Sequence, residues 1–144
     1  MDIKRIVVGT IVGYIAIQAL YYLVFDTLFG DFYVANAVSP NVLKTPYLQS
    51  VNAINLVAGA LLITLGLEAR GNPSVASAAV TGAVIGLLVW IQADAYYYAA
   101  TNTFQFVIVI VDPLLSAIVT GIAGAVIAAV LARIPKGAGL QAAE

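Results

Sequence analysis

Two aspartates, Asp94 and Asp112, lie inside long apolar stretches of the sequence and are the residues best suited to carry chemistry. A carboxylate in an apolar environment costs free energy, so in membranes it usually pairs, binds an ion or relays a proton. If the two carboxylates approach each other, a shared proton or a bound cation would relieve their repulsion. The basic residue expected on the same side, Lys44, would instead pair with one acid.

Other kinds of chemistry are limited by the absence of His and Cys from the 144 residues. The chain therefore lacks the usual ligands of haem, copper, zinc and Fe–S clusters, and no His can activate a nucleophile. A site for lipid diphosphates would need more basic residues than Lys44. We expect no cofactor, no metal site and no enzymatic activity.

The apolar stretches are long enough to span a membrane. Hydrophobic residues make up 62% of the chain and charged residues 9%, against roughly 25% charged residues in soluble domains. A spanning helix needs about 20 apolar residues. We predict one all-α domain over residues 1–144, an integral membrane four-helix bundle. Its spans are expected at about residues 6–25, 51–67, 75–98 and 104–134.

The fourth stretch is longer than one span and contains Pro113, which removes a helical hydrogen bond. Either the helix kinks there, or a new helix begins at Pro113 with Asp112 as its N-cap. In the second case Asp112 is only an interfacial cap, and residues 104–111 form a strand, a loop or a short helix. Asp94 has no such explanation, because an anion near a helix C-terminus opposes the helix dipole.

Basic residues predict the orientation of the chain. With a cytoplasmic N-terminus, every Lys and Arg except Lys44 lies on the inner side, as the positive-inside rule requires. We therefore predict a multi-pass protein of the plasma (inner) membrane with both termini cytoplasmic. Residues 26–49 would form a long outer loop, with aromatic side chains at the headgroup level.

In this orientation the polar residues of all four spans fall in the outer half. We expect them to form an outward-facing polar pocket above an apolar inner half. Asn52 and Asn55 are about one helical turn apart and share a face. The candidate ligand- or ion-binding residues are Asp26, Asn52, Asn55, Trp90, Gln92, Asp94 and Asp112.

Aromatic residues, like the polar ones, are expected in the outer half of the spans. Tyr21, Tyr22 and Phe25 end the first span, and Trp90 precedes the run of residues 96–98, which are all Tyr. Rings together with carboxylates can form a cage for an organic cation, whereas rings at helix ends usually form an interfacial belt. The belt explains the terminal tyrosines, and Trp90 is the better cage candidate.

Small residues at four-residue spacing indicate close helix contacts, because they allow backbones to approach in lipid. The pattern fits contacts within one chain and contacts between chains. The glycines expected to pack helices are Gly9, Gly13, Gly82, Gly86, Gly121 and Gly124.

The third and fourth spans show the pattern Gly82-x3-Gly86, Asp94, Asn102, Asp112 and Thr120-Gly121. This pattern resembles a family of small, uncharacterised four-helix bacterial membrane proteins, in which the third span ends in Tyr-Asp and the fourth opens with Val-Asp. Ala93 stands where that family usually has Tyr. The resemblance implies a four-helix fold and a shared importance of both aspartates, but no activity.

Two hypotheses of function follow. The first is a non-catalytic accessory or structural subunit, or a homo-oligomeric scaffold, because the chain is small and lacks cofactor ligands. The second is a small proton- or cation-linked transporter or channel that uses the aspartate pocket and acts as an oligomer. We expect contact with the lipid bilayer, with other membrane subunits or a second copy, and with a small cation. The net charge of −1 argues against nucleic acid.

Overall fold

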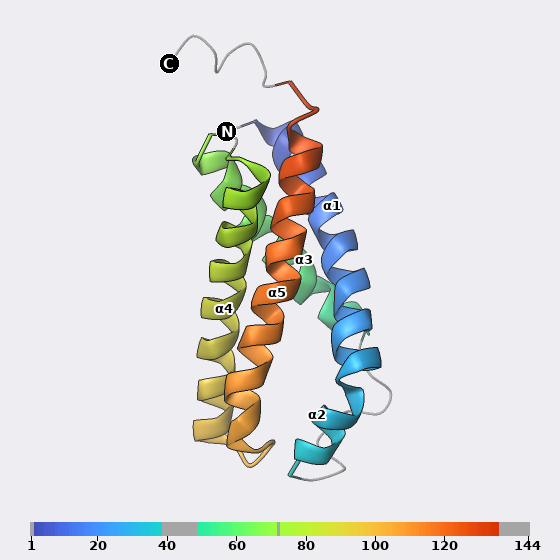
Figure 1. Cartoon of the computed structure of the whole chain (residues 1–144), viewed down its shortest axis with the longest axis vertical. Coiled ribbons are helices and arrows are strands. Elements are labelled where there is room, and N and C mark those ends of the chain that lie inside the picture. The colour runs from blue at the N-terminus through green and yellow to red at the C-terminus, as the bar shows by residue number, and fades with distance from the viewer. Residues whose placement is uncertain (1, 39–48, 72, 136–144) are drawn as a thin grey trace.

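The computed structural model describes residues 2–38, 49–71 and 73–135, and in these ranges the chain is helical. This confirms the all-α prediction. Four segments are long and apolar enough to cross a membrane: Ile3–Leu28, Asn52–Ala69, Val75–Ala100 and Phe106–Leu131. The elements are α1 (Ile3–Tyr21), the π-helix η1 (Tyr22–Leu28), α2 (Gly30–Asn36), α3 (Gln49–Ala69), α4 (Val75–Ala100) and α5 (Phe106–Leu131) (Figure 1).

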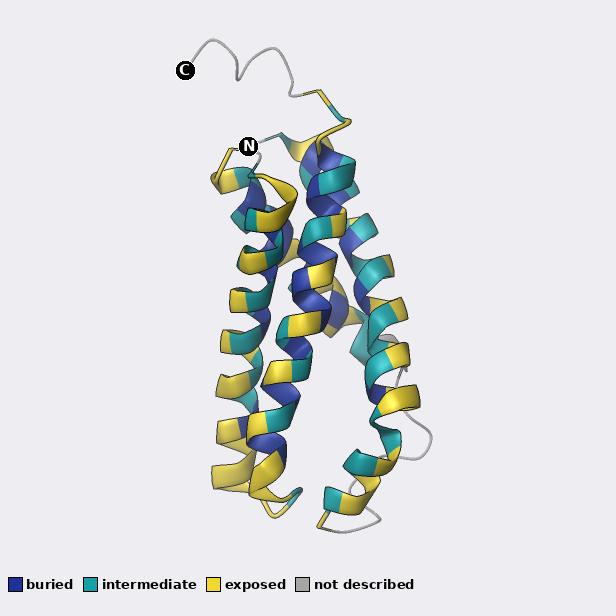
Figure 2. Ribbon diagram, in the orientation of Figure 1, coloured by how far each residue is buried: buried dark blue, intermediate teal, exposed yellow. Residues whose placement is uncertain are grey.

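Helix α5 is at the centre of the bundle. It runs antiparallel to α4, with α1 on its other side and α3 crossing behind it (Figure 1). A buried stripe follows α5 along its length, while large apolar side chains cover the outside (Figure 2). Such an apolar exterior suits contact with lipid.

The two ends of the bundle differ, and we name each by one residue that lies there. The Arg5 end holds the start of α1 and the end of α5, and the Tyr33 end holds α2 (Figure 1). The described basic residues Arg70 and Arg133 also belong to the Arg5 end, next to the end of α3 and the end of α5. The cytoplasmic location of that end stays a prediction from charge.

Glycines allow α4 and α5 to touch through their backbones. A Cβ atom added to Gly82 would overlap the carbonyl oxygen of Thr120, and one added to Gly86 would overlap the Thr120 hydroxyl. From the opposite side, a Cβ on Gly124 would lie 2.5 Å from the carbonyl oxygen of Ala78, and one on Gly121 would crowd the backbone of α4. The helices are thus fixed in one register, because only hydrogen fits at these positions.

The glycines of α1 are also used inside the chain. A Cβ on Gly9 would lie 2.6 Å from Thr64 Cγ2 of α3, and one on Gly13 would lie 2.7 Å from Ile127 Cδ1 of α5. All six glycines predicted to pack helices therefore do so within one chain. This answers the question that the sequence pattern left open.

The glycine contacts predict a clear difference between two Gly-to-Ala variants. Gly82→Ala should destabilise the protein by roughly 1–3 kcal/mol, because the new methyl group forces α4 and α5 apart. Gly59→Ala is the control, since its Cβ would meet nothing within 4 Å and the change should add roughly 0.5–1 kcal/mol of helix stability. Thermal unfolding in detergent, followed by circular dichroism, measures both. Equal midpoints would contradict the packing.

A buried ion pair joins three helices at the Arg5 end. Arg5 is fully buried, and its Nε and Nη2 atoms each lie 2.9 Å from Glu68 Oε1 of α3. Its Nη1 atom donates to the carbonyl of Leu131 at 2.7 Å and to that of Ile134. Both carbonyls lie at or just after the end of α5, where helical donors run out; the Leu131 carbonyl also accepts from Ile134 N at 3.1 Å. The expectation of an apolar inner half is therefore wrong here, where Arg5 and Thr64 are buried.

Removing one partner of this pair should cost more than removing both. Glu68→Gln leaves the Arg5 charge buried without its carboxylate, and we expect a loss of about 3 kcal/mol in the free energy of unfolding. The double variant Arg5→Met, Glu68→Leu should recover part of that loss, because no charge then stays buried. Denaturant unfolding of the single and double variants tests this. A double variant less stable than Glu68→Gln alone would contradict it.

The first part of the predicted outer loop, residues 26–49, is helical instead. The first span continues as η1, where Phe29 N donates to the carbonyl of Val24 at 2.9 Å. This backbone bond spans five residues, which is the π-helical pattern and is frequent at functional sites. The Thr27 hydroxyl also donates to the carbonyl of Tyr22 at 3.2 Å. Residues 39–48, with Lys44, lie outside the described residues.

Helix α2 is tied to the connection between α4 and α5. Val38 N donates to the carbonyl of Thr103 at 3.1 Å, and Gln105 N donates to that of Asn36 at 3.0 Å. These backbone bonds fold α2 across the end of the bundle. They bring a segment that follows the first span next to the start of the fourth.

The interpretation of Asp112 as a helix cap is wrong. Helix α5 begins at Phe106, with Gln105 at the N-cap position, and continues through Pro113 to Leu131. Spanning helices tolerate such a proline, because neighbouring groups can satisfy the carbonyl that it frees. Asp112 therefore lies within a helix, and its burial needs another explanation.

Candidate functional site

Asp94 and Asp112 meet in the interior of the bundle. Asp94 is 4% exposed and Asp112 is 8% exposed, and their carboxyl groups lie close enough to interact with each other. The register of α4 against α5 produces this contact, because Asp94 lies two turns beyond Gly86 and Asp112 two turns before Thr120. Two neighbouring carboxyl groups can share one proton, which then forms a hydrogen bond between them.

Tyr33 of α2 completes the pair from outside the spans. Its hydroxyl donates to Asp112 Oδ1 at 2.6 Å. Burial raises the pKa of Tyr33 well above its ordinary value, and the hydrogen bond to Asp112 raises it further. The phenol therefore stays protonated and remains a donor to Asp112 at physiological pH. This contact has no signal in the sequence, because Tyr33 lies in a segment predicted to be a loop.

Two buried polar atoms near the pair have no hydrogen-bond partner among the described residues: Asp94 Oδ2 and Ser116 Oγ. Ser116 lies one turn after Asp112 and is 2% exposed. A buried polar atom without a partner costs free energy, so such atoms often mark a place for water, an ion or a ligand. In the sequence, the spacing Asp112-x3-Ser116 already places these two side chains on one face of a helix.

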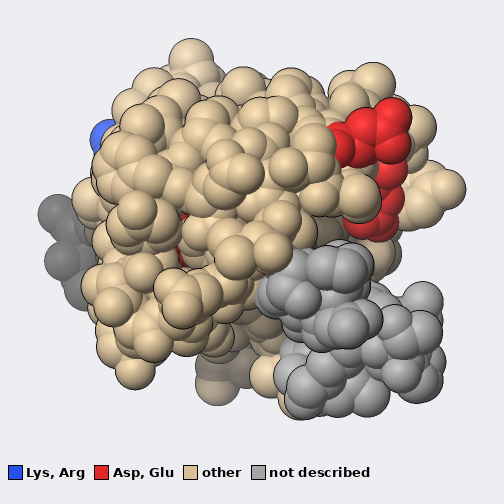
Figure 3. Space-filling model, turned by 90° about the horizontal axis from the view of Figure 1, so that it is seen from below, with Lys and Arg blue, Asp and Glu red and all other residues tan. Residues whose placement is uncertain are grey.

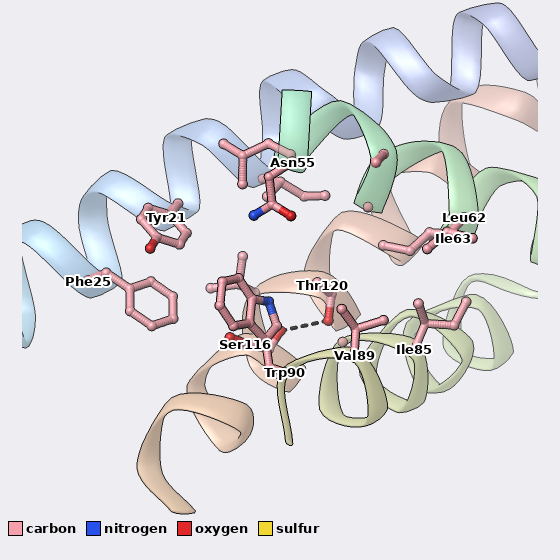
Figure 4. A pocket seen from close by; sticks show the side chains of 16 residues that line it. Tyr21, Phe25, Asn55, Leu62, Ile63, Ile85, Val89, Trp90, Ser116 and Thr120 are labelled. Atoms are coloured by element: carbon pink, nitrogen blue, oxygen red, sulfur yellow. Dashed lines mark hydrogen bonds between the residues drawn. The ribbon is translucent and has the colours of Figure 1, made fainter. Parts of the chain in front are cut away.

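A cavity of about 100 Å³ is lined by residues of all four spans (Figure 4). The labelled side chains of Tyr21, Phe25, Asn55 and Trp90 face one another across it (Figure 4). Ser116 lines the same cavity. Trp90 and Ser116 are each one turn from an aspartate, towards the Arg5 end. The acid pair therefore forms the next layer beyond the cavity.

Aromatic rings connect the cavity to the pair. Tyr21 stacks on Phe25 with ring centroids 4.4 Å apart, and the Phe25 and Tyr33 centroids are 5.7 Å apart. Tyr33 in turn contacts Asp112. The π-helical turn of η1 holds Phe25 in this row, where it is 7% exposed.

The structure brings together some of the candidate residues and separates others. Asp94, Asp112, Trp90 and Asn55 gather at the cavity and the acid pair, whereas Asp26 and Gln92 are exposed on the outside. Asn52 is half-buried at the start of α3 and does not line the cavity. Tyr22 and the three terminal tyrosines of α4 are exposed, as an interfacial belt requires.

Charged groups are sparse around the site. Seen from the Tyr33 end, the surface is almost uncharged apart from one acidic patch (Figure 3), and the exposed acids of this end are Asp26 and Asp31. Within the described ranges, neither Asp94 nor Asp112 forms an ion pair with Lys or Arg, and no three His, Cys, Asp or Glu residues group as a metal site. Lys44 cannot be placed, because it lies outside those ranges.

The fold and the site define a multi-pass membrane protein with a buried pair of acids. No family model, curated protein or solved structure matches the chain. The family resemblance seen around Gly82, Asp94 and Asp112 therefore stays a prediction.

The environment of Tyr33 predicts its behaviour in alkali. Because its pKa is raised in the folded protein, Tyr33 should not ionise up to about pH 12, whereas an ordinary tyrosine ionises near pH 10. Tyr33→Phe should therefore leave the tyrosinate absorbance change of the folded protein unaltered over that range. In denaturant, the absorbance change of the same variant should be smaller than that of the wild type by the contribution of one tyrosine. This measurement is the control.

The same shift affects stability. Above about pH 10 the unfolded chain releases the Tyr33 proton and the folded chain keeps it, so stability should fall with rising pH. Tyr33→Phe should remove the contribution of this tyrosine to the fall of the free energy of unfolding with pH. A loss of absorbance amplitude in the folded variant would show that Tyr33 titrates normally and would contradict both expectations.

Proposed function

We propose that the protein is a small proton-linked membrane transporter and that the Asp94–Asp112 pair is its proton-binding element. One observation carries the proposal: two buried carboxyl groups from neighbouring spans lie next to each other. Acids inside spans are costly, and they mark ion pathways and proton relays in transporters and pumps. A bundle that needed only packing would be more stable with apolar residues at these two positions.

The chemistry of the pair supports an exchange of positive charges. With one proton, the pair carries a single negative charge, which Tyr33 stabilises by donating to Asp112. If that proton leaves, two carboxylates face each other at low dielectric, and their repulsion favours the uptake of another proton or cation. The pair can therefore couple the release of a proton to the binding of a cation.

A second candidate is the accessory subunit or homo-oligomeric scaffold. The exposed Gln92 supports it, because an amide on the outer face of a spanning helix gains from a partner helix. The glycines no longer support it, since they pack within the chain. A transporter with four spans is also expected to form an oligomer, so an interface at Gln92 fits both candidates.

Proton flux into vesicles tests the proposal. Purified protein is reconstituted into liposomes that contain a pH-sensitive dye, and a potassium diffusion potential drives protons inward. We expect faster acidification than in protein-free vesicles and a loss of roughly tenfold in Asp94→Asn, because the amide cannot exchange a proton. Asp31→Asn removes an exposed acid at the same end and should keep the wild-type rate.

Two outcomes would contradict transport. One is a wild-type flux no faster than that of empty vesicles, which would leave the accessory role. The other is an unchanged flux in Asp94→Asn, which would place the pathway elsewhere. Circular dichroism and monodispersity of each variant show that it is folded, so that a lost flux reports on the carboxyl group.

A further inference from the structure

The cavity has the size and the lining for a small organic molecule. An engineered apolar cavity of about 150 Å³ binds benzene, so a volume of about 100 Å³ suits a ligand of about five non-hydrogen atoms. The rings of Tyr21, Phe25 and Trp90 line it together with aliphatic side chains. Ring faces attract cations as well as apolar groups.

The buried polar atoms near one end of the cavity favour a ligand group that carries several hydrogen-bond donors. Ser116 lines the cavity, and Asp94 lies in the next layer, one turn beyond Trp90. Ser116 Oγ and Asp94 Oδ2 are buried and lack a hydrogen-bond partner among the described residues. An ammonium group has three N–H donors and a positive charge, so one such group can serve several acceptors. A neutral hydroxyl has one donor and brings no charge to the carboxylates.

The cavity opens to the outside of the bundle between α3 and α4. Leu62 of α3 and Val89 of α4 line it, and they are 49% and 43% exposed. Because these helices are membrane spans, this opening faces the lipid. A ligand with an apolar body can therefore enter from the membrane.

We infer that the cavity binds a small lipophilic amine as its ammonium ion, with the nitrogen towards Ser116 and Asp94 and the apolar body among Tyr21, Phe25 and Trp90. The inference rests on the proposed function, since it names the cation that exchanges with the proton of the acid pair. On binding, the N–H groups donate to Ser116 and Asp94, and the proton of the pair passes to water. Among the described residues, the titratable side chain that contacts the pair is Tyr33 of α2, and Tyr21 of α1 lies near Tyr33.

The single tryptophan of the chain is a built-in reporter, because Trp90 lines the cavity. Its fluorescence is recorded for the full chain in nanodiscs while n-butylammonium is added at neutral pH, where an alkylamine is charged as Lys is. The matched control is n-butanol, which has the same length and no charge. We expect a saturable change with the amine and only a weak, non-saturating change with the alcohol.

Two variants locate the ammonium group. Asp94→Asn should weaken amine binding about tenfold, because a charge-assisted hydrogen bond is lost. Ser116→Ala should weaken it by a smaller factor and serves as the second variant if Asp94→Asn does not fold. Asp31→Asn should bind as the wild type does. Equal responses to amine and alcohol, or unchanged binding in both site variants, would overturn the inference.

Failure of this inference can be distinguished from failure of the proposed function. If Asp94-dependent proton flux persists while n-butylammonium produces no saturable signal, the pair carries protons and the cavity does not take an amine. If amine binding depends on Asp94 while no flux occurs, the cavity is a binding site and transport is wrong. In the coupled case, n-butylammonium inside the vesicles should accelerate Asp94-dependent proton entry.

Discussion

The close contact of α4 with α5 is the constraint on which the site depends. Positions four residues apart on α4, from Ala78 through Gly82 and Gly86, lie against the backbone and small side chains of α5, and a methyl group at either glycine would collide with Thr120. Neither helix can slide without a clash, so the register is fixed at these contacts. Two turns further along, the same register brings Asp94 to Asp112. The position of the acids is therefore a consequence of glycines that take no part in the chemistry.

The two ends of the bundle are closed by different means, and this leaves the middle open. At one end Arg5 satisfies Glu68 and the last carbonyls of α5, so three helices are held by one side chain. At the other end α2 is attached by backbone hydrogen bonds and reaches the acid pair only through Tyr33. Between them α3 and α4 make few contacts, and the cavity lies in this gap. A fold fixed at both ends and open to lipid at mid-height can admit a ligand without unfolding.

The sequence predicts the helices better than their register. Apolar length is a local property, so the four spans and the all-α fold follow from it, and Asp94 is recognisable because it opposes its helix dipole. Which face of α5 contacts α4 is not a local property of the sequence. Small residues occur on two faces of this helix, one with Ala117, Gly121 and Ala125 and the other with Thr120, Gly124 and Ala128. The contacts of Arg5 and Tyr33 also join residues distant in the chain, and no periodic pattern encodes them. The prediction that Asp112 caps a helix beginning at Pro113 is wrong, because a spanning helix tolerates this proline.

If the four-residue series of small residues on α4 continued, a small neutral residue would stand at the position of the acid. Ala78, Gly82 and Gly86 let the two backbones touch, yet the next two positions of the series are Trp90 and Asp94. The chain thus replaces backbone contact by a ring beside a cavity and by a carboxyl group that needs a proton or cation to be stable. An apolar residue at either acid would avoid the cost of burying a charge. The pair therefore makes physical sense as a site that exchanges positive charge, and little sense as a device for holding two helices that glycine already holds.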